Sequence, residues 1–269
     1  MSRLMNLANR TAVVTGAASG IGRAIAISLS QRGCHLALAD VNEGQLAGTA
    51  EAAASQGVRV SQHRLDVSDR TAVAAFPALV RAAHAGVDIL VNNAGVALGG
   101  TFDQVDESDF EWLFEVNFWG VVRMTRAFLP LLRVSDDACL VNLSSVYGLI
   151  SPPGHVAYSA SKFAVRGFTQ ALLHELEGSR VAVTMVLPGG VATAIARSAR
   201  TPKNEPAQYI AESLRRFERR LRLPAAVAGE TIVRGIERRK PRVLVGADAK
   251  FVSLVERLAP VSYWRLLKH

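Results

Sequence analysis

Apolar residues along the chain follow two alternating patterns, short continuous runs and longer stretches with helical spacing. The run Thr11–Thr15 is typical of a short β-strand, and Ile21, Ile25 and Leu29 then recur every four residues, which marks one face of a helix. The alternation continues to residue 246. It predicts further strands at 35–40, 58–65, 87–91, 139–143, 181–187 and 242–246, and helices that include an alanine-rich one ending near 57, a long one at about 108–132 and one at 158–177.

Several of these expected strands are continuous apolar runs. Such runs are typical of a parallel sheet that is covered by helices on both faces. The repeated strand-helix order predicts an α/β fold with a single Rossmann-type, doubly wound parallel sheet of about seven strands. No repeat, low-complexity tract or Gly/Ser linker interrupts the sequence, so we expect residues 1–269 to form one domain.

The composition agrees with one large apolar core, since 49% of the 269 residues are hydrophobic. Residues 1–10 contain no apolar stretch of the secretory-signal type, and no run approaches the ~20 apolar residues that span a bilayer. Cys34 and Cys139 each begin a strand-like run and are expected to be buried free thiols. These features predict a cytoplasmic protein.

The net charge of +8 is concentrated in one segment, 197–242, which holds 13 Lys or Arg residues against 5 Asp or Glu residues. Outside it the charges balance. Any function of the excess positive charge must therefore belong to this segment. The six histidines show no close pairing of the metal-site type, so no metal is expected.

The first strand leads into a glycine-rich turn directly before a helix, with glycines at 16, 20 and 22. Glycine permits a tight turn and lets backbone N–H groups approach a pyrophosphate at a helix N-terminus. An ordinary glycine-rich turn is the alternative interpretation. Asp40, at the end of the second strand, favours a dinucleotide site because a carboxylate there can accept a hydrogen bond from the adenosine ribose.

The same carboxylate would repel the 2′-phosphate of NADP. No Arg or Lys lies at 17–19 or just after Asp40 to bind that phosphate. NAD is therefore the favoured cofactor, with NADP as the alternative.

Tyr158 and Lys162 are four residues apart in a helical context, so they share one face of the helix. A nearby ammonium stabilises a phenolate and is expected to lower the tyrosine pKa toward the working range of a general base. A surface Tyr/Lys pair is the alternative. Ser145 weighs against it, because it lies at the C-terminal end of the fifth strand, where ligands bind in open α/β sheets.

The glycine spacing resembles the T-G-x-x-x-G-x-G pattern of the short-chain dehydrogenase/reductase family. The resemblance extends to about Thr193 through Asp66-Val67, Asn92-Asn93-Ala94-Gly95 and Pro188-Gly189-Gly190-Val191-Ala192-Thr193, each after a strand. It implies cofactor contacts from Gly16, Ser19, Gly20, Ile21, Gly22, Asp40, Asp66, Val67, Asn93, Ala94, Gly95, Tyr158, Lys162, Pro188, Gly189, Val191 and Thr193.

The resemblance also implies four catalytic residues: Asn117, Ser145, Tyr158 and Lys162. Ser145 would hold the substrate oxygen, Tyr158 would transfer the proton, and Lys162 would lower the tyrosine pKa and bind the nicotinamide ribose. Asn117 would anchor a water that relays the proton, unless it is a capping or helix-kinking asparagine. Between Ser145 and Tyr158 stands His155, which we expect to be an exposed loop residue, although a place beside the substrate stays open.

The segment at about 194–223 corresponds to the family's variable substrate lid. It interleaves apolar residues with Arg215, Arg216, Arg219, Arg220 and Arg222. A solvated amphipathic helix, a lid for an anionic or lipid-like substrate, and a face for peripheral membrane contact are the alternatives. No nucleic-acid recognition module is apparent. By resemblance, a homodimer or homotetramer is expected.

Two classes of function follow. The first is an NAD(H)-dependent oxidoreductase acting on a secondary alcohol or ketone, with an NADPH-dependent ketoreductase as its variant. The second is a nucleotide-binding sensor or scaffold without turnover. The presence of all four catalytic positions favours the enzyme.

Overall fold

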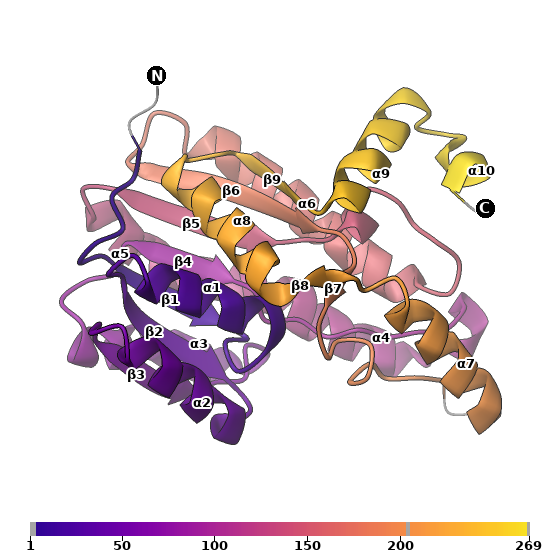
Figure 1. Cartoon of the computed structure of the whole chain (residues 1–269), viewed down its shortest axis with the longest axis horizontal. Coiled ribbons are helices and arrows are strands. Elements are labelled where there is room, and N and C mark those ends of the chain that lie inside the picture. Colours follow the sequence, from indigo (N-terminus) through magenta and orange to yellow (C-terminus); the bar gives the residue numbers. More distant parts are fainter. Residues whose placement is uncertain (1–3, 203–204, 268–269) are drawn as a thin grey trace.

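The structure, a computed structural model, describes residues 4–202 and 205–267, apart from the side chains of residues 207 and 209. Its main sheet has seven strands, all parallel, in the order β3-β2-β1-β4-β5-β6-β9 (Figure 1). This arrangement confirms the predicted doubly wound parallel sheet. The strands are β1 (Thr11–Thr15), β2 (His35–Asp40), β3 (Val60–Arg64), β4 (Ile89–Asn92), β5 (Ala138–Leu143), β6 (Val181–Pro188) and β9 (Arg242–Val245); β7 (Val191–Ala192) and β8 (Leu223–Pro224) pair separately.

Helices cover both faces of the sheet. In Figure 1, α1 and α8 lie in front of the sheet, and α3, α5 and α6 lie behind it. The helices are α1 (Gly20–Ser30), α2 (Glu43–Ala54), α3 (Arg70–Ala83), α4 (Glu107–Phe114), α5 (Gly120–Val134), α6 (Val156–Glu175), α7 (Ala207–Glu218), α8 (Ala225–Glu237), α9 (Ala247–Leu258) and α10 (Tyr263–Leu267).

The two-sided cover explains the continuous apolar runs. In β1, Ala12 and Val14 pack into the core beneath α1 and α8, whereas Val13 packs into the opposite core with α3 and α5. Because successive side chains of a strand point to opposite faces, each face of a buried strand needs apolar residues.

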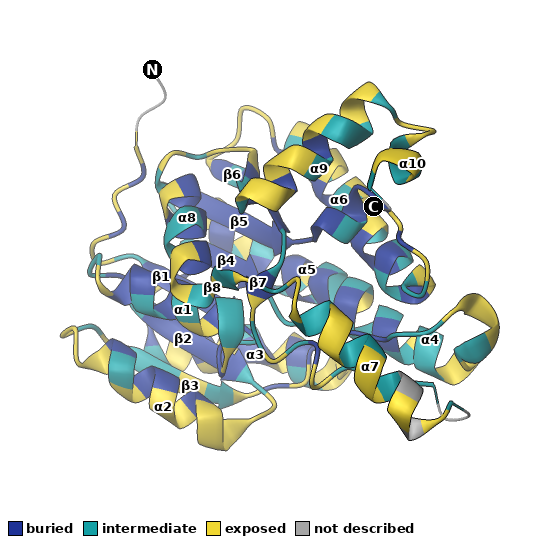
Figure 2. Ribbon diagram, turned by 45° about the vertical axis from the view of Figure 1, so that its right-hand side comes forward, coloured by how far each residue is buried: buried dark blue, intermediate teal, exposed yellow. Residues whose placement is uncertain are grey.

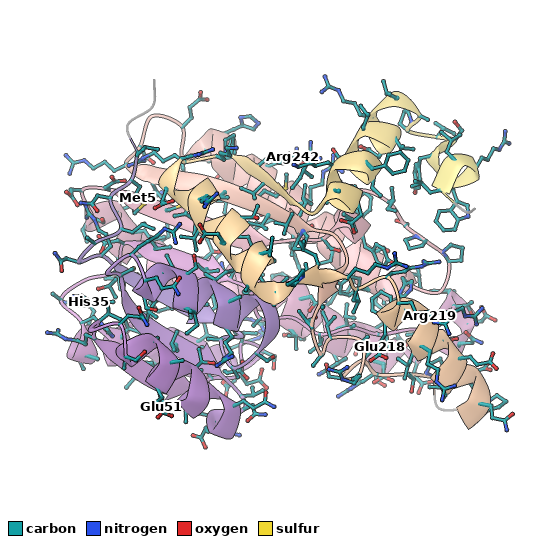
Figure 3. All side chains as sticks on the ribbon, viewed as in Figure 1. Met5, His35, Glu51, Glu218, Arg219 and Arg242 are labelled. Carbon is teal, nitrogen blue, oxygen red and sulfur yellow. The ribbon has the colours of Figure 1, made fainter. Side chains whose placement is uncertain are left out.

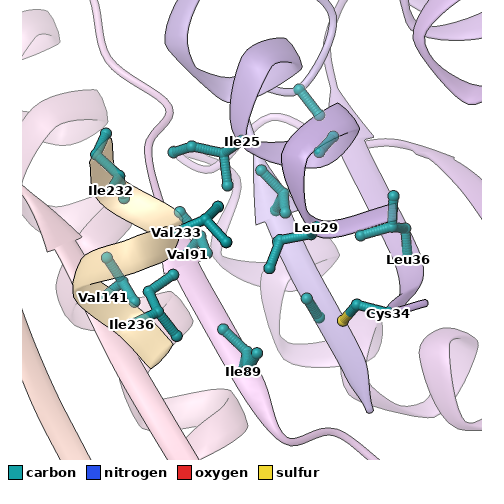
Figure 4. Packing of buried hydrophobic residues seen from close by; sticks show 14 of the residues in the cluster. Ile25, Leu29, Cys34, Leu36, Ile89, Val91, Val141, Ile232, Val233 and Ile236 are labelled. Carbon is teal, nitrogen blue, oxygen red and sulfur yellow. The ribbon is translucent and has the colours of Figure 1, made fainter. Parts of the chain in front are cut away.

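The front core depends on a close crossing of α1 and α8, whose apolar side chains meet over the central strands (Figure 4). A Cβ atom on Gly229 would lie 2.5 Å from the backbone carbon of Ala24, so a side chain there would push the helices apart. Arg32 on α1 forms ion pairs with Glu230 and Glu237 on α8, at 2.9 and 2.8 Å. The crossing therefore combines a small-residue contact with charge pairing.

The long helix predicted at about 108–132 is interrupted. It is divided into α4 and α5 by a π-helical turn, Glu115–Trp119, that contains Asn117. The start of α5 also packs closely against the loop that follows β3, because a Cβ atom on Gly120 would lie 2.8 Å from a methyl carbon of Val67. Such π turns insert one extra residue and are frequent at functional sites. Hydrophobic spacing cannot reveal this single-residue insertion.

The lid segment predicted at about 194–223 consists of turns followed by α7, and its residues 203–204 lie outside the described part. Figure 2 shows α7 as a largely exposed helix at the edge of the molecule. At the other end of the chain, α10 packs through Tyr263 and Leu267 against a small apolar cluster at the end of β6. Cys34 and Cys139 are buried, as predicted. Within the described residues, no helix combines the length and apolarity that crossing a membrane requires.

Candidate active site

The carboxyl ends of the strands border a cavity of about 950 Å³. In open α/β sheets ligands bind in this position. Most of the positions predicted from sequence line its wall: Gly16, Ser19, Gly20, Ile21, Asp40, Asp66, Val67, Asn93, Ala94, Gly95, Ser145, Tyr158, Lys162, Pro188, Gly189, Val191 and Thr193. Two predicted positions, Gly22 and Asn117, lie behind that wall and contact its residues from the protein side.

The glycine-rich turn after β1 is held from beneath by Asn93. Its carboxamide nitrogen donates hydrogen bonds to the carbonyl oxygens of Thr15 and Gly16, at 2.9 and 3.0 Å. Gly16 has a φ of +64°, which favours glycine. A Cβ atom on Gly22 would lie 2.0 Å from the Gly16 carbonyl oxygen, so no side chain fits there. Gly22 therefore shapes the turn.

Asp40 lies at the end of β2 beside this turn. Its carboxylate accepts hydrogen bonds from the backbone N–H of Ala18 at 3.0 Å and of Asn42 at 2.9 Å. The described residues that line the cavity directly after it, Val41, Asn42 and Gln45, are uncharged. This end of the cavity therefore presents a carboxylate without a cation beside it on the wall. Asp66, on the next loop, turns toward Ser68, whose N–H and hydroxyl donate to Oδ1.

Tyr158 and Lys162 lie one turn apart on α6, with the ammonium nitrogen 5.6 Å from the centre of the tyrosine ring. Burial lowers the pKa of Lys162 to about 8. The prediction that the pKa of Tyr158 is lowered is wrong, because burial raises this pKa to about 12. Removing the phenolate from water raises the pKa by more than the nearby Ser145 hydroxyl lowers it.

The Lys162 ammonium has three hydrogen-bond donors. Among the described residues, it has one acceptor, the carbonyl oxygen of Leu143 at 3.3 Å. Two donors are therefore left for a bound molecule. Lys162 lines the cavity, so these donors are available to hydroxyl groups inside it.

The two serines after β5 have different partners. The Ser144 hydroxyl donates to the backbone carbonyl of Lys162 at 2.8 Å and so ties β5 to α6. The Ser145 hydroxyl lies close enough to Tyr158 to lower its pKa, and it accepts a hydrogen bond from the N–H of Tyr147 at 3.1 Å. Ser145 is thus the hydroxyl that adjoins the tyrosine in the cavity, and it is the serine that the family resemblance implied.

Asn117 is fully buried in the π-helical turn. Its Oδ1 accepts from the N–H of Val96 at 2.8 Å, and its Nδ2 donates to the Val96 carbonyl at 3.0 Å and to the Ser161 hydroxyl at 3.2 Å. Both Nδ2 hydrogens are used, so this nitrogen cannot hold the expected relay water. The side chain fixes the strand end next to Gly95, where an added Cβ atom would lie 3.1 Å from Asn117 and 3.4 Å from Lys162.

The loop after β6 has a partner that sequence reasoning missed. The carboxylate of Asp248, in the first turn of α9, accepts a hydrogen bond from the N–H of Gly190 at 2.6 Å. Added Cβ atoms on Gly189 and Gly246 would each lie 2.3 Å from that carboxylate. In the sequence, Asp248 follows two residues after Gly246, at the end of the last strand. This pattern is too common in proteins to indicate a role.

A second cavity of about 310 Å³ adjoins the first. It is lined by the predicted lid and by His155, so the prediction of an exposed loop histidine is wrong. His155 is half-buried and lies against the rings of Tyr147 and Phe217, with centroids 5.1 and 5.4 Å away. Burial, with help from the charge of Arg220, lowers its pKa to about 4, so it is neutral at pH 7. Neither Tyr147 nor Phe217 has a sequence signature of its own.

Known proteins resemble the chain over most of its length. It is 46% identical over 261 residues, 96% of this chain and 94% of the relative, to SadH of Mycobacterium tuberculosis, described as an oxidoreductase. A short-chain dehydrogenase/reductase from Burkholderia phymatum, solved in complex with NAD, has a TM-score of 0.88 at 32% identity and covers 95% of both chains. A metagenomic short-chain oxidoreductase solved with NADP has a TM-score of 0.65 at 34% identity and covers 70% of this chain and 85% of its own.

The family of short chain dehydrogenases matches residues 10–204, a range that contains the glycine-rich turn, Asn117, Ser145, Tyr158 and Lys162. The match agrees with the parallel sheet and with the cavity at its carboxyl edge. The chain therefore belongs to the short chain dehydrogenase family.

Proposed function

We propose that the chain is an NAD(H)-dependent oxidoreductase that interconverts a secondary alcohol and a ketone, with Tyr158 as general acid and base. One observation carries this proposal. Tyr158 lines the cavity at the carboxyl edge of the sheet together with Ser145 and with Lys162, which is one helical turn away.

The cavity residues suit a nicotinamide dinucleotide. A volume of about 950 Å³ lies at the upper end of the range for small-molecule sites. The glycine-rich turn would hold the pyrophosphate at the N-terminus of α1, where backbone N–H groups favour an anion. The free donors of Lys162 would bind the nicotinamide ribose. When bound, the nicotinamide supplies the hydride acceptor or donor.

The chain's own groups provide the proton chemistry. With a pKa of about 12, Tyr158 is protonated at neutral pH and can donate to the alkoxide that develops when a ketone is reduced. In alcohol oxidation the phenolate form of Tyr158 must accept the hydroxyl proton, and the positive charge of Lys162, 5.6 Å from the ring centre, would stabilise that form. Ser145 would orient the substrate oxygen toward Tyr158 by hydrogen bonding.

The preference for NAD over NADP rests on Asp40. Its carboxylate would accept a hydrogen bond from a ribose hydroxyl and would repel a 2′-phosphate. Similar structures hold either cofactor, NAD in the Burkholderia protein and NADP in the metagenomic one. The closest alternative is an NADPH-dependent ketoreductase. A sensor without turnover is a weaker alternative, because the Tyr/Lys pair is present and lines the cavity.

The test is a turnover screen of the purified full chain over secondary alcohols with NAD and with NADP, and over ketones with NADH and NADPH. Neutral, anionic and lipid-like substrates belong in the panel. We expect turnover with NAD(H) at a higher kcat/KM than with NADP(H). Binding of NADH without turnover of any member would support the sensor instead, and a preference for NADPH would support the ketoreductase.

A further inference from the structure

The two cavities meet at four residues that line both of them: Tyr158, Ile195, Phe217 and Arg220. A molecule that occupies the second cavity therefore reaches the proposed proton donor at this junction. The junction also contains a permanent positive charge, because an arginine stays protonated at physiological pH.

Beyond the junction the second cavity is mainly apolar. Its aliphatic and aromatic wall comes from the loop after β4 and from the lid, through Leu98, Ile195, Ile210, Leu214 and Phe217. A volume of about 310 Å³ suits one hydrocarbon body of modest size. Apolar atoms placed there leave water, which favours binding in proportion to their area.

Arg220 lies near two uncharged groups. Its guanidinium acts on the pKa values of the Tyr147 hydroxyl and the His155 ring. No carboxylate of the described residues forms an ion pair with it. Other arginines of the region are paired, Arg197 with Glu218 at 3.3 Å and Arg200 with Asp109. The charge of Arg220 is thus available to an anion at the junction.

The other lid arginines divide between the cavities and the outer surface. Arg219 and Arg222 line the large cavity but not the second one. Arg216, one turn before Arg220, lines the second cavity and also has no ion pair within the described chain. Arg215 lies on the same helix but lines neither cavity. Figure 3 shows the neighbouring Glu218 and Arg219 at the C-terminal end of α7, on the flank of the molecule opposite Met5 and His35. The excess positive charge therefore divides into groups that face the cavities and groups that do not.

Building on the function proposed above, we propose that the substrate is an amphipathic hydroxy acid or the corresponding oxo acid. Its carboxylate binds Arg220 at the junction, and its apolar body fills the second cavity. Because Arg220 and Tyr158 share the junction, the carboxylate lies close in the molecule to the reacting carbon. A guanidinium is well suited to this role, since its planar N–H groups match a carboxylate.

The reaction balances with NAD as the oxidant. Tyr158 first releases its own proton to water. The carbinol C–H bond then breaks and its hydride goes to the nicotinamide, while the hydroxyl O–H bond breaks and its proton goes to the Tyr158 phenolate. The C=O double bond forms, and the alcohol is oxidised as NAD is reduced. The carboxylate is unchanged, so its contribution is to binding and orientation.

The test compares β-hydroxydecanoate with its methyl ester, which has the same chain without the charge. For the wild-type chain with NAD we expect a higher kcat/KM for the acid. Losing a hydrogen-bonded ion pair weakens binding by roughly 10- to 100-fold. The Arg220→Met variant should lose that much of the preference for the acid, mainly through KM, and Arg220→Lys should lose less. Arg215→Met, the control at a lid arginine on α7 that lines neither cavity, should keep the wild-type preference.

A binding measurement separates this inference from the proposed function. Decanoate has no hydroxyl group, so its binding needs no turnover. Titration calorimetry should show decanoate binding to wild-type and Arg215→Met chains and its loss in Arg220→Met. That result would support the anion site even if no alcohol were oxidised. Equal preference of wild-type and Arg220→Met chains for acid over ester, or equal binding of decanoate, would overturn it and leave the oxidoreductase intact.

Discussion

The carboxylate of Asp248 accepts a hydrogen bond of 2.6 Å from the backbone N–H of Gly190. The two residues are 58 positions apart, and the contact joins the first turn of α9 to the loop that follows β6. That loop carries Val191 and Thr193, which line the large cavity. The start of the C-terminal helix pair therefore supports a wall of the proposed cofactor site.

Replacing Asp248 should weaken cofactor binding. A hydrogen bond to a charged group contributes about 1.5–3 kcal/mol, so Asp248→Ala should raise the Kd for NADH roughly tenfold or more. Asp248→Asn keeps one oxygen acceptor and should recover part of the loss. Fluorescence titration with NADH measures both. An unchanged Kd in Asp248→Ala, with normal thermal unfolding, would show that the loop holds its position without this contact.

Replacing Asp40 should change the choice between cofactors. Asp40→Ala removes the proposed ribose acceptor and the charge that repels a 2′-phosphate. The ratio of kcat/KM for NAD to that for NADP should fall by roughly 10- to 100-fold. Steady-state kinetics with both cofactors measure the ratio, and the melting temperature controls for the lost contact with Ala18. If the ratio stays the same, the cofactor argument is wrong.

Removing the Tyr158 hydroxyl should abolish most turnover and keep cofactor binding. General acid-base catalysis contributes about 10²–10⁴-fold, and Tyr158→Phe should lose that much of kcat. Phenylalanine preserves the ring on the cavity wall, so NADH should still bind. Turnover that stays near the wild-type value would contradict the proposed mechanism.

His155 should make the protein less stable in acid. Its folded-state pKa of about 4 is below the unfolded value of 6.5, so between these pH values the unfolded chain binds more protons. The free energy of unfolding should rise with pH across this window and fall as pH decreases through it. The full difference corresponds to about 3 kcal/mol. His155→Gln should remove this part of the pH dependence in urea unfolding, while His84, whose pKa is also lowered to about 4, keeps its own part.

Gly22 and Gly48, whose φ angles lie outside the left-handed region, form a matched pair for substitution by alanine. Gly22→Ala would put a Cβ atom 2.0 Å from the Gly16 carbonyl oxygen and should destabilise the fold and the cofactor turn. Gly48, within α2, has no atom within 4 Å of an added Cβ. Gly48→Ala should therefore stabilise the chain by about 0.5–1 kcal/mol, as helix propensity predicts. Thermal unfolding of the two variants measures the contrast, and similar effects would refute the steric explanation.

Much of this architecture could be predicted from local patterns. Continuous apolar runs with glycines at their ends predicted the parallel strands, and a strand end is where such a sheet binds ligands. These patterns placed Asp40 and Ser145 at one edge of the sheet, and the family resemblance added Tyr158. The π-helical turn at Asn117 escaped prediction because it changes the helix by one residue and leaves the apolar spacing almost unaltered.

The amino-acid sequence by itself determined the α/β class, the order of strands and helices, and the residues whose chemistry suits the cavity. These depend on periodicity and on short motifs, which are local. The tertiary structure decided what depends on distant residues: that Asp248 supports Gly190, that His155 is half-buried, and that burial raises the pKa of Tyr158 to about 12. Solvent exclusion and packing arise only when separate segments meet, so they cannot be predicted from the spacing of residues along the chain.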